Sequence, residues 1–148
     1  MIFPPAVVAA IVEVASGSVK GGDLWAGEGF TPAEPLDLKS YAAGVRWLRE
    51  IGGVSVGGMP VPTDARTQSV LTAAYASAVA DAEYAIADWK VAPGTYVALS
   101  NATIRAVAVA VRSHIQACFT KNREVDEAID AGQITGTAGI DAAFAAMD

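Results

Sequence analysis

The sequence has one cysteine and one histidine among its 148 residues. A single cysteine, Cys118, can form neither an intrachain disulfide nor a four-thiolate zinc site. Basic residues are also scarce, because ten Lys and Arg stand against sixteen Asp and Glu and the net charge is −6. Binding to a phosphate backbone depends on clustered Lys and Arg, so we expect no nucleic-acid partner.

Long apolar runs are missing as well. Residues 1–14 are apolar apart from Glu13, but a helix needs about 20 residues to cross a bilayer. The same stretch lacks the positively charged start of a signal peptide. We therefore expect no membrane insertion.

The N-terminal residues 1–35 are predicted to form an extended docking arm. Residues 17–35 are rich in Gly and Pro, which is typical of loop-like chain that needs a surface to hold it. The arm packs either on its own domain or on a neighbouring protein, and the sequence does not separate the two. The apolar side chains available for this contact are Ile2, Phe3, Val7, Ile11, Trp25 and Phe30.

Residues 36–148 are predicted to form an α+β domain that is mainly helical, with about three longer helices and one or two short β-hairpins. Apolar residues at three- and four-residue steps predict the first helix over residues 36–50. These residues are Leu38, Tyr41, Ala42, Val45 and Leu48. A hairpin follows over residues 54–61, with Gly57-Gly58 as its turn. Thr63-Asp64 supplies the N-cap of a second helix that runs to about Ala85.

Pro93-Gly94 predicts a second hairpin within residues 88–99. Ser100 then caps the last long helix, and Leu99 with Ile104 can form a hydrophobic staple across its start. A loop and a short terminal helix follow Gly132. Trp47 and Trp89 are interpreted as core anchors, because an indole buries a large area. The alternative for both indoles is stacking against a sugar.

The last long helix contains the clearest pattern of the chain, a heptad seam sustained over roughly four heptads. Its apolar positions, with one Asn among them, alternate at steps of four and three from Ile104 to Ile129. The seam packs either against the earlier helices of the same chain or against other copies, and a trimer suits the second interpretation. A single buried Asn would then fix the register. The residues of the oligomer seam would be Val111, Ile115, Cys118, Asn122 and Val125.

Few residues suggest chemistry. His114 and Cys118 are four apart on the last helix, as a base and its nucleophile could be. A thiol in an apolar seam behaves as a small hydrophobic group, however, so a structural role is favoured. Gly52-Gly53 and Gly57-Gly58 lack the Lys of a phosphate-binding loop. We therefore expect no catalytic, cofactor-binding or metal-binding residues and no enzymatic activity.

The order of pieces between about Ser40 and Ile129 carries a resemblance to a known family. It runs from Arg46-Trp47 through Gly52 to Asp64, then Trp89-Lys90 and Pro93 to Val97, and ends on His114 to Phe119. This order resembles a domain-of-unknown-function family found in phage tail-fibre and tail-fibre-assembly proteins.

The resemblance implies a location in the virion, on or near a phage tail, after assembly in the host cytoplasm, with other tail proteins as partners. The implied function is a non-enzymatic structural component of the fibre or baseplate. The alternative is a tail-fibre assembly chaperone that is absent from the mature virion.

Overall fold

The computed structural model describes residues 24–25, 30–31 and 35–147, and the chain divides into two units, residues 1–36 and 37–148. In the first unit, the strands β1 (Leu24–Trp25) and β2 (Phe30–Thr31) pair antiparallel, with Trp25 opposite Phe30. The other residues of the predicted docking surface, Ile2, Phe3, Val7 and Ile11, lie outside the described residues. Docking through this arm stays a prediction.

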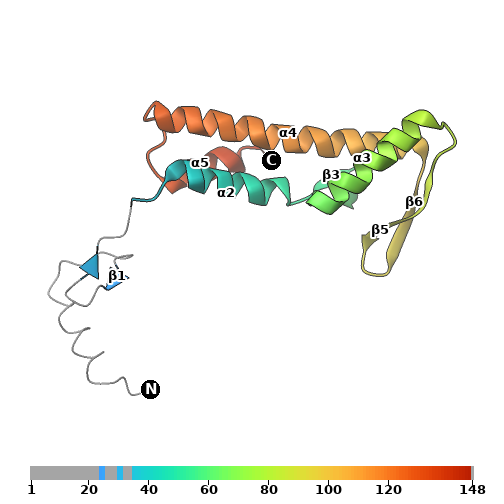
Figure 1. Ribbon diagram of the computed structural model, residues 1–148, viewed down its shortest axis with the longest axis horizontal. Coiled ribbons are helices and arrows are strands. Elements are labelled where there is room, and N and C mark those ends of the chain that lie inside the picture. Colours follow the sequence, from blue (N-terminus) through green and yellow to red (C-terminus); the bar gives the residue numbers. More distant parts are fainter. Residues whose placement is uncertain (1–23, 26–29, 32–34, 148) are drawn as a thin grey trace, which may run out of the picture. The chain divides into compact units, whose positions relative to one another are not determined.

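The second unit consists of helices and two short antiparallel hairpins, so the predicted α+β, mainly helical fold is confirmed. Its helices are α2 (Leu38–Glu50), α3 (Ala65–Ala80), α4 (Asn101–Asp130) and α5 (Thr137–Ala145). The first hairpin pairs β3 (Val54–Val56) with β4 (Met59–Val61). The second hairpin pairs β5 (Ile86–Ala92) with β6 (Thr95–Leu99) and projects away from the helices (Figure 1).

Short polar side chains begin three of these helices. Asp37 and Asp64 accept backbone N–H groups at the starts of α2 and α3, and Ser100 does the same for α4. Each cap satisfies a donor that the first helical turn leaves without a partner. The caps predicted for α3 and α4 are thus confirmed.

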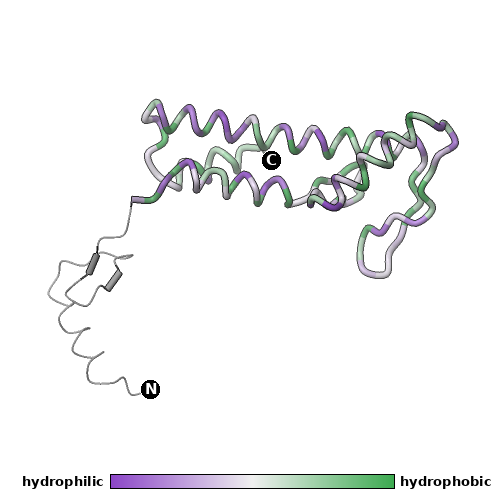
Figure 2. The backbone as a smooth tube through the Cα atoms, in the orientation of Figure 1, coloured by the Kyte–Doolittle hydropathy of each residue, from purple (hydrophilic) through white to green (hydrophobic). Residues whose placement is uncertain are grey.

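Helix α4 is the axis of the second unit. It packs against α3 along its N-terminal half and against α2 along its C-terminal half (Figure 1). Helix α5 packs against both α2 and the C-terminal half of α4. Purple and green alternate along α2 and α4 in Figure 2, as expected for helices with one buried and one solvated face. The buried side comprises Ile104, Val107, Ala108, Val111, Cys118 and Val125.

The core differs from the predicted one at the end of α2. Trp47 is 52% exposed and Leu48 is 61% exposed, so neither is a core residue. Ala42 is the buried residue of this helix, and the side chains that turn toward it are Leu38, Tyr41 and Val45. Trp89 does pack against the core, between the clusters centred on Leu71 and on Ile104, as predicted.

Helix α3 ends five residues before the predicted Ala85. Asp81 has an extended backbone, and its carboxylate accepts the N–H of Glu83 at 2.9 Å. The side-chain amide of Asn101 on α4 donates to the carbonyls of Ala78 and Asp81 at 2.8 and 2.9 Å. This tertiary cap satisfies one carbonyl in the last turn of α3 and the carbonyl of its C-cap residue, and the local sequence alone does not reveal it.

Within the described part of the chain, no helix combines the length and the apolar character that crossing a membrane requires.

Candidate binding surface

Aromatic and arginine side chains, some exposed and some half-buried, gather on one side of α2, α3 and α4. Trp47 of α2 is 52% exposed, and Phe119 of α4 is 48% exposed. The guanidinium of Arg46 lies 4.4 Å from the centre of the Phe119 ring. Farther along α4, the guanidinium of Arg112 lies 5.1 Å from the centre of the Tyr75 ring on α3. We name the surface around these five residues, which extends along α4 from Arg105 to Asp126 and Asp130 and includes Asp37 and Lys39 at the start of α2, the arginine–aromatic flank.

A seven-residue spacing on α4 produces this flank. Arg105, Arg112, Phe119 and Asp126 follow one another at steps of seven, which is nearly two helical turns. Their side chains therefore share one side of the helix. Each comes one position after a buried residue of the seam, so the flank borders the core; those residues are Ile104, Val111, Cys118 and Val125.

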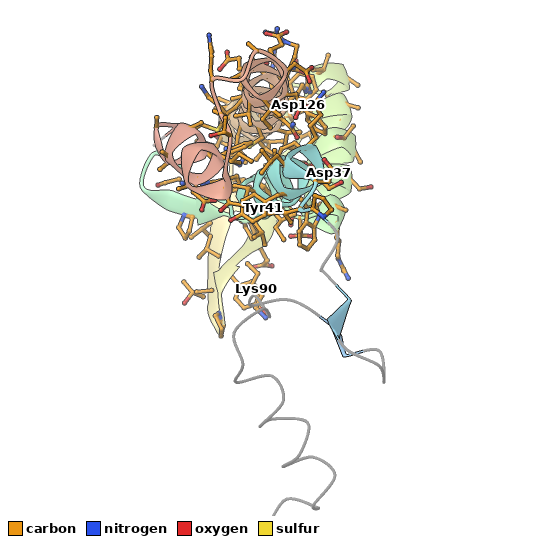
Figure 3. The ribbon with its side chains drawn as sticks, turned by 90° about the vertical axis from the view of Figure 1, so that its left-hand side faces the viewer. Asp37, Tyr41, Lys90 and Asp126 are labelled. Carbon is orange, nitrogen blue, oxygen red and sulfur yellow. The ribbon has the colours of Figure 1, made fainter. Side chains whose placement is uncertain are left out.

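Helix α5 covers the opposite side of α2. The Tyr41 hydroxyl of α2 donates to Asp141 of α5 at 3.0 Å, and this bond raises the pKa of Tyr41. Figure 3 shows α5 on one side of α2 and α3 on the other. The arginine–aromatic flank lies on the side away from α5, where Trp47 and Phe119 stay about half exposed.

Arg46 is held in place by two partners. Its guanidinium forms an ion pair with Glu50, one helical turn later, and both side chains are less than one-fifth exposed. The same guanidinium packs over the Phe119 ring. A carboxylate at its edge and a ring at its face restrict the rotamers of Arg46, so this part of the flank is organised before any partner arrives.

One end of the flank is acidic. Lys39 forms an exposed ion pair with Asp130 at 2.7 Å, and the Asp130 carboxylate raises the pKa of Lys39. Asp126 accepts from the Asn122 amide at 3.0 Å, while its second oxygen is buried with no hydrogen-bond partner. Hydrogen bonds from Ser40 lower the pKa of Asp37. Figure 3 labels two of these carboxylates, Asp37 and Asp126. The three carboxylates outnumber the Lys39 ammonium, and the charge of nearby Arg123 is offset by its ion pair with Glu127, so this end is negative.

The other end of the flank is basic. Neither Arg105 nor Arg112 forms an ion pair with any residue between 35 and 147. Residues 65–80 of α3 and 101–119 of α4 contain no Asp or Glu. The flank thus runs from a positive end, through the Trp47–Phe119 region, to a negative end.

An open apolar groove lies at the hairpin end of the second unit. It has a volume of about 710 Å³ and is lined by the β3–β4 turn, by β6 and by the start of α4. A neighbouring groove of about 470 Å³ shares Pro60 and Val91 with it. Both suit the docking of an apolar surface better than that of a charged ligand, since apolar side chains and backbone line them.

The His114–Cys118 pair has a structural arrangement. The Nε2 atom of His114 lies 2.9 Å from the carbonyl oxygen of Arg49, which can only accept, so Nε2 carries the proton. The Cys118 sulfur lies 3.8 Å from the same nitrogen. That nitrogen cannot act as a base toward the thiol while it donates to Arg49. Cys118 is buried, and burial raises the pKa of its thiol, with a smaller contribution from the Glu50 carboxylate.

The residues of the predicted oligomer seam face their own chain. Val111, Cys118 and Val125 are at most 3% exposed, and Ile115 packs against the cluster around Leu71. Half-buried Asn122 bonds within its own helix, to Asp126. Packing inside one chain accounts for this burial, and self-association through the seam stays a prediction.

No group of three or more His, Cys, Asp and Glu side chains placed to hold a metal ion occurs among the described residues.

The arginine–aromatic flank was not predicted from the sequence. A signal for it exists, because the position after each seam residue carries Arg, Arg, Phe and Asp in turn.

Comparisons with known proteins identify the domain. Neither the curated proteins nor the solved structures contain a match to the chain. A family model described as a domain of unknown function, DUF4376, matches residues 34–146, which include all of α2 to α5. The chain therefore belongs to the DUF4376 family.

Proposed function

We propose that the chain is a non-enzymatic structural component of a bacteriophage tail, an accessory or adaptor of the fibre or baseplate that acts by protein–protein packing. The observation that carries this proposal is the arginine–aromatic flank. Trp, Tyr, Phe and Arg are the residue types enriched at protein interfaces, and here they stand together, partly exposed and partly pre-ordered.

The ground for proposing a phage tail is the order of motifs along residues 40–129, which resembles that of tail-fibre-associated proteins. A structural tail protein needs surfaces for its neighbours, and this chain offers two: the flank and the apolar grooves beside the hairpins. The N-terminal arm, with Ile2, Phe3, Val7 and Ile11, is proposed as a third docking element.

The test is quantitative mass spectrometry of purified infectious particles, with the copy number measured against the major tail protein. We expect the chain at a fixed, low stoichiometry that survives a salt wash of the particles. Expression during infection without incorporation into particles would contradict the proposal and favour the assembly chaperone.

A further inference from the structure

We propose that the arginine–aromatic flank is a self-complementary surface that pairs two copies of this chain about a twofold axis. The inference does not depend on the proposed function. It commits to a second copy as the occupant because the charges along the flank have the order that twofold pairing requires.

The first step concerns charge. A twofold axis perpendicular to α4 makes α4 of one copy antiparallel to α4 of the other, so each end of the flank meets the opposite end of the partner. Arg105 then faces the acidic end formed by Asp37, Asp126 and Asp130. The negative ends are separated from each other, as are the positive ends. A head-to-head parallel arrangement would instead bring like charges together.

The second step concerns register. When Arg105 lies opposite Asp126 of the partner subunit, the seven-residue spacing brings Arg112 opposite Phe119 of the partner subunit. The first contact pairs opposite charges, and the second places a guanidinium beside an aromatic ring. One register therefore satisfies both pairs, and each occurs twice by symmetry. Gln116, which is exposed, lies next to the axis in this arrangement.

The third step concerns the centre. Phe119 is 48% exposed, packs against the Arg46 guanidinium and lies near the middle of the flank, and Trp47, which is 52% exposed, is the next residue of α2 after Arg46. Aromatic side chains near the centre and charged side chains toward the ends match the arrangement of a specific interface.

The fourth step concerns size. Arg105 and Asp126 are about 30 Å apart along α4 at about 1.5 Å per residue, and two neighbouring helices give a width of about 20 Å. The strip measures about 600 Å² on each copy, so the pair reaches the lower end of the range for specific interfaces, about 1,200 Å² in total. Interfaces at this end of the range include weak and transient complexes, so we expect a dimer that dissociates in the micromolar range.

The test is sedimentation velocity or light scattering of the full chain over the micromolar range. The expected mass rises with concentration from 15.1 kDa to twice that value. Phe119→Ser and Trp47→Ser should each weaken the dimer at least about tenfold. The matched control is Val70→Ser, which changes a 44% exposed apolar residue on the outer side of α3 and should leave the dimer unchanged. Far-UV circular dichroism verifies that each variant is folded.

A charge-reversal cycle tests the antiparallel arrangement. Arg105→Glu and Asp126→Arg should each weaken the dimer, because like charges then face each other across the axis. Both changes in one chain should restore it, since opposite charges face each other again. A chain that stays monomeric at all concentrations, a trimer, or a dimer indifferent to the flank variants would each overturn the proposal.

Discussion

Thr63 is the one polar residue among residues 35–147 that is fully buried, and its hydroxyl joins three elements. It donates to the carbonyl of Glu50 at the end of α2 and accepts the N–H of Gly53 at 2.9 Å, just before β3. Thr63 itself lies between β4 and the cap of α3. Because this buried hydroxyl both donates and accepts, it fixes the position of the first hairpin between the end of α2 and the start of α3.

Thr63→Val should destabilise the fold by about 2 kcal/mol, because it leaves the part-buried N–H of Gly53 and carbonyl of Glu50 without their partner while keeping the side-chain shape. Urea unfolding followed by circular dichroism measures the loss. Thr72→Val is the control, since this hydroxyl is exposed and bonds only to the carbonyl of Gln68; we expect a change of less than about 0.5 kcal/mol. Equal effects at the two positions would contradict this account of Thr63.

Asp64 gives the cap of α3 a pH dependence. Hydrogen bonds from the hydroxyl and the N–H of Thr67 lower the pKa of Asp64 below 3.8. Its stabilising contribution is therefore present above pH 3.8 and is lost as the pH falls through the lowered pKa.

Asp64→Asn should keep most of the cap, because the amide oxygen can accept the same N–H groups, but it removes the titrating carboxylate. The difference in urea midpoint between the wild type and Asp64→Asn should thus shrink or reverse as the pH is lowered past 3.8. Asp64→Ala should lower the midpoint at neutral pH. A wild-type advantage that stays constant down to pH values below the lowered pKa would refute the assignment.

At the scale of elements, the sequence predicts most of the fold. Helix α2, the β3–β4 hairpin, the caps at Asp64 and Ser100 and the short terminal helix all follow from local periodicity and turn residues. Two features of the fold do not follow from local periodicity or turn residues. The end of α3 depends on Asn101, a residue 20 positions away, and the exposure of Trp47 depends on which side of α2 meets α4.

The binding surface escaped prediction for the same reason. Its contacts join residues far apart in the sequence, Arg46 with Phe119 and Tyr75 with Arg112. Periodicity locates the buried seam of α4, but it does not show which neighbouring stripe the other helices leave exposed. That depends on the placement of α5 against α2, which only the tertiary structure gives.

Alanine substitutions at two glycines should change the stability of the protein in opposite directions. Gly44 lies inside α2 with open space where a Cβ atom would lie, so Gly44→Ala should stabilise the protein by about 0.5–1 kcal/mol. Gly94 has φ +73° in the turn after Pro93, where a side chain has space but the backbone is strained. Gly94→Ala should therefore destabilise by about 1 kcal/mol. Thermal unfolding of both variants compares them directly, and a common sign would contradict the assignment.

At the scale of the whole molecule, residues 37–148 hold the three clusters of buried apolar side chains. Removing residues 1–35 should accordingly leave the helical unit folded and abolish any binding that the arm provides. Circular dichroism and urea unfolding of the shortened chain test the first statement, and a shortened chain without cooperative unfolding would refute it. Unchanged binding to tail proteins by the shortened chain would refute the docking arm.

The central claim is that this chain works by packing against other proteins in a phage tail, and lysine cross-linking of intact purified particles tests it most directly. The described lysines report on separate places: Lys39 on α2, Lys90 on the projecting hairpin (Figure 3) and Lys121 on α4. The account predicts cross-links from these lysines to tail proteins, together with links between copies from Lys39 at the acidic end of the flank. Particles that contain the chain without any cross-link to tail proteins, or that lack the chain, would contradict it.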